Sequence, residues 1–227
     1  MNDLLLSSGF LAFARHVGFL QAVEAERVPV DAVVGTSSGA LVGALWAAGV
    51  PGAELERLVA GRRPLDLMGL HAAPWRGLFV LEPLVAWLRE HVPPTIEELP
   101  RPFAAGVAAP DGTPTLLTSG PLPEAVAASC AIPWLFVPVA HGAQRWRDGG
   151  VVDRLMVGPW RAWRGERPGL AHVVERTGGR DVDVDLAGVR VVRTPRSSAT
   201  FWSLGDVPAA AAEARARASA ALVHAPG

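Results

Sequence analysis

The chain of 227 residues has no lysine, no tyrosine and a single cysteine, Cys130. Without lysine there is no Schiff-base chemistry and no lysine for a phosphate-binding P-loop, and without tyrosine there is no tyrosine acid or base. One cysteine cannot form a disulfide within the chain, and the alanine-rich surroundings of Cys130 indicate an inert buried thiol. The formal net charge of −1 gives no overall field that would favour a nucleic-acid partner.

The N-terminus also lacks the features of a targeting segment. It has no basic region, Asp3 interrupts it, and the leucine run at 4–6 is too short for the core of a signal peptide. No hydrophobic run approaches the length of a membrane span, so we expect a cytoplasmic protein. Half of the residues are hydrophobic and the length suits one sizeable core, which predicts a single domain over residues 1–227.

Short apolar runs, many of them β-branched, alternate with stretches of helical periodicity along the chain. Strands are expected at 4–6, 30–34, 103–109, 113–118, 171–176, 181–186 and 189–194, with an irregular pair within 134–147. Helices are expected at 11–26, 40–48, 52–59, 83–92, 122–132 and 208–223. This alternation predicts an α/β fold with a largely parallel sheet covered on both faces.

The most informative motif is the G-x-S-x-G pattern that runs from Gly35 to Gly39, with Ser37 at its centre, between an expected strand and an expected helix. Small flanking residues let the backbone turn sharply and lift the serine out of the sheet edge. The following helix directs its first N–H groups at whatever the serine attacks. This is the arrangement of a nucleophile for acyl transfer; the alternative is a tight strand-to-helix turn with an idle serine.

A serine hydroxyl needs a base within hydrogen-bond reach, and Asp148 is the best candidate. Gly149 and Gly150 follow it, and their backbone freedom would allow the carboxylate to face a pocket rigidly. The alternative is a simple turn, as expected for Asp111-Gly112 between two strands. Because an ordinary carboxylate is a weak base for a serine, we expect a desolvated site that raises the pKa of Asp148.

These pieces together resemble the patatin-like phospholipases. The shared features are Ser37 in its motif, the later Asp148-Gly149-Gly150, the stretch at 128–133, and a short first strand that ends in a small-residue loop. The elbow at residue 37 comes too early for an α/β-hydrolase. The resemblance implies a three-layer α/β/α sandwich, a Ser37–Asp148 dyad without histidine, and lipid acyl hydrolysis through an acyl-enzyme. Such a reaction needs no cofactor, and no metal site is expected.

The first loop departs from the family pattern, which is G-G-G-x-[RK]-G. Only Gly9 of the glycines survives, and Ala12 stands in place of the basic residue. Backbone N–H donors remain at such positions whatever the side chain. The resemblance therefore assigns the oxyanion hole to the N–H groups of Ser8, Gly9, Phe10 and Ser38. The eroded loop motivates one rival function, a catalytically silent relative that binds lipid or a protein partner; acyl transfer to an acceptor other than water is another.

Several further features leave alternatives open. His172 and His224 follow Asp148 in the chain, as the histidine of a full triad would, whereas His16 is expected to be a packed helix residue. No pair of histidines has metal-ligand spacing. Asp181, Asp183 and Asp185 would share one face of a strand, either as a solvent-facing edge or as a calcium site.

Two apolar stretches are candidates for contact with lipid. Residues 159–167 combine tryptophans and arginines, which fits either a peripheral bilayer contact or a surface loop with its indoles packed on the core. Residues 64–82 are rich in large apolar side chains, typical of a lid or acyl pocket or of plain core. The expected partner is a lipid or other acyl ester; the sequence does not predict an oligomeric state.

Overall fold

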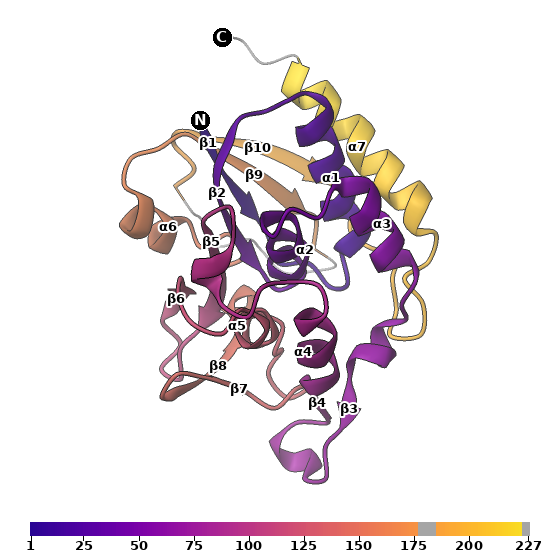
Figure 1. The fold of residues 1–227 in the computed structure, drawn as a ribbon, viewed down its shortest axis with the longest axis vertical. Helices are drawn as coiled ribbons and strands as arrows, with labels where there is room; N and C mark the ends of the chain where they lie inside the picture. The colour runs from indigo at the N-terminus through magenta and orange to yellow at the C-terminus, as the bar shows by residue number, and fades with distance from the viewer. Residues whose placement is uncertain (177–184, 224–227) are drawn as a thin grey trace.

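A computed structural model describes residues 1–176 and 185–223 of the chain (Figure 1). Its central sheet has the strand order β10-β9-β1-β2-β5-β8-β7, with β6 also paired to β5. The strands are β1 (Asn2–Leu6), β2 (Val30–Thr36), β5 (Phe103–Ala108), β6 (Pro114–Leu117), β7 (Val139–His141), β8 (Gln144–Asp148), β9 (Gly169–Val174) and β10 (Val189–Thr194). Strands β10, β9, β1, β2 and β5 are parallel, and β6, β7 and β8 add antiparallel pairs at one edge. The predicted mostly parallel α/β sheet is confirmed.

Helices follow most of the strands along the chain. They are α1 (Phe13–Ala25), α2 (Ser38–Ala47), α3 (Gly52–Ala60), α4 (Glu82–Arg89), α5 (Leu122–Ser129), α6 (Val157–Arg164) and α7 (Val207–Val223). All but α6 lie where the sequence predicts them. Between α3 and α4 the chain forms the short elements η1 (Pro64–Leu67), β3 (Gly69–Leu70), η2 (Pro74–Arg76) and β4 (Phe79–Val80). These short elements project from the lower end of the molecule in Figure 1.

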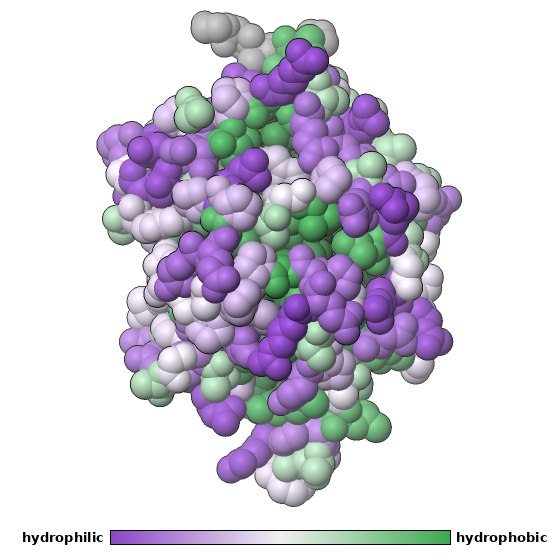
Figure 2. Space-filling view, in the orientation of Figure 1, coloured by the Kyte–Doolittle hydropathy of each residue, from purple (hydrophilic) through white to green (hydrophobic). Residues whose placement is uncertain are grey.

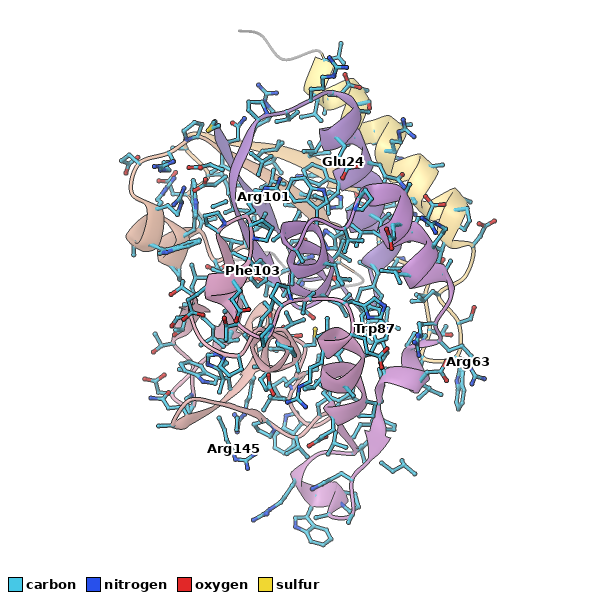
Figure 3. The ribbon with its side chains drawn as sticks, in the orientation of Figure 1. Glu24, Arg63, Trp87, Arg101, Phe103 and Arg145 are labelled. Atoms are coloured by element: carbon cyan, nitrogen blue, oxygen red, sulfur yellow. The ribbon has the colours of Figure 1, made fainter. Side chains whose placement is uncertain are left out.

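The sheet separates two hydrophobic cores, because successive side chains of a strand point to opposite faces. Leu4 and Leu6 of β1 pack in the larger core with α1 and α2, whereas Leu5 packs in the smaller core with Trp160 of α6. Phe103, at the start of β5, is 1% exposed and belongs to the larger core in the middle of the molecule (Figure 3). Helices therefore cover both faces of the sheet and give three layers. The coverage is unequal, because α1 and α2 pack in the larger core whereas α6 packs in the smaller one.

Helix α7 lies along α1 and joins the C-terminal part of the described chain to its beginning. A Cβ built on Gly18 of α1 would lie 2.0 Å from the Ala211 carbonyl oxygen, so the two helices can approach this closely only at a glycine. Glu213 pairs with Arg15 of α1 at 2.5 Å and with Arg217 at 3.3 Å. The predicted helix therefore also closes one side of the larger core.

Parts of the sequence-based description concern residues that the structure does not describe. Asp181, Asp183 and His224 lie outside the described residues, as does most of the strand expected at 181–186. Within residues 1–176 and 185–223, no helix is both long and apolar enough to cross a bilayer.

Candidate active site

Ser37 lies in the single-residue gap between β2 and α2. Its backbone angles are φ 55° and ψ −118°, a conformation that a non-glycine residue adopts at a cost of roughly 1–3 kcal/mol. Ser37 is half-buried and is the N-terminal capping position of α2, whose first N–H groups have no helical acceptor. The strand–turn–helix context predicted for the G-x-S-x-G motif is therefore present, and the strain is carried by the serine itself.

The glycines around Ser37 and Asp148 are required for close packing. Gly35, Gly39, Gly149 and Gly150 all lack a positive φ. A Cβ on Gly35 would lie 2.4 Å from the Gly39 carbonyl oxygen, and one on Gly150 would lie 2.4 Å from Ser8 Oγ. The expectation that Gly149 and Gly150 supply unusual backbone angles was wrong, because their role is to leave space.

One short segment at the end of α5 holds both halves of the site. The hydroxyl of Ser129, which is fully buried, accepts a hydrogen bond from the Ser37 N–H at 2.8 Å and donates one to the Gly106 carbonyl at 2.6 Å. Two residues further on, the carbonyl of Ala131 accepts a hydrogen bond from the Asp148 N–H at 2.9 Å. Residues 129–131 therefore position the serine turn relative to the end of β8.

Cys130 lies between these two residues, and its surroundings are not those of a reactive thiol. Its Sγ lies 3.4 Å from the Ser37 carbonyl oxygen, to which it donates, and its side chain lines an apolar cavity. Burial and the nearby Asp148 carboxylate both raise the pKa of the thiol well above its usual range. The thiol therefore stays protonated, in keeping with the inert cysteine that the sequence indicates.

Asp148 ends β8 and is 3% exposed. Burial raises the pKa of its carboxyl from 3.8 to about 6, while hydrogen bonds from the Ser37 side chain and the Gly150 N–H act in the opposite direction. The bond from Gly150 N to Oδ1 is 2.7 Å long and closes a turn. The sequence analysis treated a turn and an interaction with Ser37 as alternatives for Asp148. Its carboxylate does both, because it accepts the Gly150 N–H bond that closes the turn and also interacts with the Ser37 side chain.

The first loop has fewer backbone N–H groups without an acceptor than the expected oxyanion hole requires. The N–H of Ser8 already donates to the Arg154 carbonyl at 3.0 Å, so the assignment of Ser8 does not hold. Among the described residues, no acceptor is found for the N–H groups of Gly9, Phe10 and Ser38, and these three residues line the cavity that contains Ser37. Leu11 follows with φ 47°, a strained position for a leucine in a loop that has lost its glycines.

Arg154 holds this loop in place and was not singled out from the sequence. Its Nη2 donates to the carbonyls of Ser8 at 2.7 Å and Val174 at 2.5 Å, and its Nε donates to Ser8 Oγ at 3.3 Å. The side chain thereby ties the loop after β1 to the end of β9. Nothing in the sequence around Arg154 distinguishes it from the other basic residues of the chain, 21 in all. The one indication was that Ala12 stands where the family has a basic residue in the first loop, so that another residue could take that place.

Two cavities meet at Ser37. The first is lined mainly by hydrophobic side chains of α2, η1, α4 and residues 132–136. The second is more polar than the first, although hydrophobic residues also line it, and it contains Asp148, Arg154, Arg176 and Arg196. Pro64, Leu67 and Met68 lie in the apolar wall, so the N-terminal part of the stretch at 64–82 borders a pocket, as its composition suggested.

The histidine of a possible full triad is engaged elsewhere. His172 is fully buried, with Nδ1 2.8 Å from His16 Nδ1 and Nε2 2.9 Å from Thr194 Oγ1, and it stacks on Phe19. Burial lowers the pKa of both histidines, that of His16 to about 3. Neither lines the two cavities at Ser37. The expectation that His16 is a packed helix residue is confirmed.

The tryptophan- and arginine-rich stretch at 159–167 is folded inward. Trp160 is 1% exposed and donates from Nε1 to Asp3 at 3.0 Å, and Arg164 forms ion pairs with Asp3 at 2.9 Å and Asp31 at 2.6 Å. These contacts engage the Trp160 indole and the Arg164 guanidinium within the protein, and Trp163 packs half-buried against the smaller core. The interpretation in which the indoles pack on the core is the correct one here, although the segment is mostly helix α6 rather than a loop.

Asp185, the described member of the acidic triplet, is on the protein surface. It pairs with Arg161 at 3.1 Å and accepts a hydrogen bond from the Ala187 N–H at 2.9 Å. These contacts agree with a solvent-facing role for this carboxylate.

Comparison with known proteins identifies the family. The family model described as Patatin-like phospholipase matches residues 4–159. An uncharacterized NTE family protein of Mycobacterium tuberculosis is 32% identical over 164 residues, which are 69% of this chain and 44% of that protein. The chain therefore spans less than half the length of this relative.

Solved structures share the fold at low sequence identity. VipD from Legionella pneumophila has a TM-score of 0.64 and 14% identity, with 98% of this chain and 66% of VipD covered. ExoU of Pseudomonas aeruginosa, in complex with SpcU, has a TM-score of 0.56 and 15% identity, with 98% of this chain and 52% of that chain covered. From the match of the family model over residues 4–159, the chain belongs to the patatin-like phospholipase family.

Proposed function

We propose that this protein hydrolyses acyl esters of lipids, with Ser37 as nucleophile and Asp148 as base. The observation that carries the proposal is the position of Ser37 at the junction of an apolar and a polar cavity, beside a buried carboxylate. An acyl chain in the first cavity and a polar headgroup in the second would leave the ester carbonyl at Ser37 Oγ. Family membership supports the same chemistry.

The reaction takes two acyl-transfer steps. Ser37 Oγ attacks the ester carbonyl as Asp148 accepts its proton, and the N–H groups of Gly9, Phe10 and Ser38 stabilise the oxyanion. Collapse of the tetrahedral intermediate breaks the ester bond, and the leaving alcohol takes the proton from Asp148. A water molecule then attacks the acyl-enzyme, Asp148 accepts its proton, and the fatty acid leaves as that proton returns to Ser37 Oγ.

The polar cavity favours a substrate with an anionic headgroup. Arg154, Arg176 and Arg196 line it together with the single glutamate Glu175 and with Asp148. Guanidinium groups bind phosphate oxygens with charge-assisted hydrogen bonds. We therefore expect a phospholipid to be a better substrate than a neutral acylglycerol with the same acyl chain.

Hydrolysis of p-nitrophenyl butyrate and of a phospholipid by the wild-type protein, Ser37→Ala and Asp148→Asn tests the proposal. We expect turnover by the wild type and a loss of about 10³-fold or more in both variants. Full activity of Asp148→Asn would require a different base. A folded wild type that turns over neither ester would favour the alternative function, a silent relative that binds lipid or a protein partner.

A further inference from the structure

The chain exposes large hydrophobic side chains at one end, next to the site. Of the eight tryptophans, Trp75, Trp134 and Trp202 are 80%, 88% and 75% exposed. Trp75 lies between Leu70 and Leu78, which are 86% and 49% exposed. We use the name hydrophobic tip for Leu70, Trp75, Leu78 and Trp134.

The four residues come from two segments that are hydrogen-bonded to each other. The Phe79 N–H donates to the Leu135 carbonyl at 2.9 Å, and the Val137 N–H donates to the Phe79 carbonyl at 3.0 Å. Within the first segment, the His71 N–H donates to the Leu78 carbonyl at 3.1 Å and closes a hairpin. The hydrophobic tip is therefore a built projection and not a set of scattered side chains.

Both segments run directly into the wall of the apolar cavity beside Ser37. Met68 and Leu81, on either side of the first segment, line that cavity. Ile132 and Phe136, on either side of Trp134, line it as well. The hydrophobic tip is thus the outward continuation of the surface that would hold an acyl chain.

The first of the two segments can be followed in the views of the whole molecule. The first segment follows Arg63, which is labelled in Figure 3, and runs to the lower end of the molecule. Figure 2 shows hydrophobic residues exposed in this lower part among hydrophilic ones.

Composition and backbone geometry distinguish the hydrophobic tip from ordinary surface. Residues 69–80 and 132–138 contain no acidic residue, and their titratable groups are His71 and Arg76. Indoles together with cations are typical of protein segments that sit at the headgroup level of a bilayer. Trp134 has φ 70°, a costly conformation for an aromatic residue, and it keeps the indole in solvent between two cavity-lining neighbours.

We propose that the hydrophobic tip docks the protein on a lipid surface, so that a lipid passes from the bilayer along the tip into the cavity at Ser37. The passage of a lipid from the bilayer into the cavity rests on the proposed function, in which a lipid is the substrate. Docking itself needs only the exposed indoles and Arg76 and no catalysis.

Sedimentation with vesicles of phosphatidylcholine and phosphatidylglycerol in equal amounts tests the docking. The protein carries Ser37→Ala in every case, so vesicle binding is measured without hydrolysis and independently of the proposed function. Trp75→Ala with Trp134→Ala removes both indoles of the hydrophobic tip. Trp202→Ala is the matched control, because it removes an indole of similar exposure from outside the tip.

We expect the double variant to lower the partition coefficient at least about tenfold, since each indole would bury much of its apolar area in the interface. The control should stay within about twofold. Absence of binding by the parent protein, or equal losses in the double variant and the control, would overturn the proposal. A parent that is dimeric in gel filtration and becomes monomeric in the double variant would assign the hydrophobic tip to a second copy of the chain instead.

Discussion

Replacing Asp148 by asparagine separates the catalytic role of this residue from its cost to the fold. Asparagine has nearly the same shape, and its Oδ1 can still accept the hydrogen bond that Gly150 N donates at 2.7 Å. It cannot ionise and cannot accept the proton of Ser37. We therefore expect Asp148→Asn to lose activity and to gain stability at neutral pH.

The size of the gain follows from the pKa of Asp148. Burial raises this pKa from 3.8 in the unfolded chain to about 6 in the fold, which corresponds to about 3 kcal/mol. Because the folded-state pKa is the higher one, the folded chain is favoured when the carboxyl is protonated. That contribution is fully present below pH 3.8 and is lost as the pH rises through about 6. Asparagine does not ionise, so Asp148→Asn does not lose this part of the free energy of unfolding as the pH rises.

The assay is urea or thermal unfolding of both proteins between pH 4 and pH 8. The variant should be more stable by about 3 kcal/mol at pH 7, or roughly 6–12 °C in Tm for a chain of this size, and the difference should shrink towards zero near pH 4. A variant that is less stable than the wild type at pH 7, or a difference that does not change with pH, would refute the reasoning about the buried carboxylate.

Other predictions concern the groups that hold the site together. Gly150→Ala places a Cβ 2.4 Å from Ser8 Oγ and should lower the kcat of ester hydrolysis by about 10² or more. Gly158→Ala is the control, because no atom lies near its added Cβ, and it should leave kcat unchanged. Ser129→Ala removes the hydrogen bonds that this hydroxyl makes with the Ser37 N–H and the Gly106 carbonyl and should cost about 2–4 kcal/mol in urea unfolding. Arg154→Lys should lower kcat about 10²-fold without changing the KM of a short ester; an equal change in KM would argue against a positioning role. The kcat/KM of the wild type should fall about tenfold per pH unit below pH 6, because the base must be ionised; a flat profile between pH 4 and 6 would exclude Asp148 as that base.

The sequence was sufficient to predict the parts of the site that local patterns encode. The G-x-S-x-G turn and the later Asp-Gly-Gly are local features that appear where they were expected, and so do the described helices except α6. The buried environment of Asp148 was also predictable, from the chemical need of a serine for a stronger base.

Features that depend on distant contacts could not be predicted in the same way. The space required at Gly150 is set by Ser8, 142 positions away in the chain. The burial of Trp160 depends on Asp3, and the exposure of Trp134 depends on its turn between two cavity-lining residues. A tryptophan in a sequence does not reveal which of these environments it will have, which is why residues 159–167 were considered as a membrane contact and Trp134 was not.

Covalent labelling is the most direct test of the central claim, which is that Ser37 is a nucleophile activated in this cavity. The folded protein is treated with a fluorophosphonate and its adducts are located by tandem mass spectrometry. We expect one adduct per chain, on Ser37, with none in Ser37→Ala and much slower labelling of Asp148→Asn. An unlabelled Ser37 in a folded protein, or a stoichiometric adduct on another serine, would contradict the account.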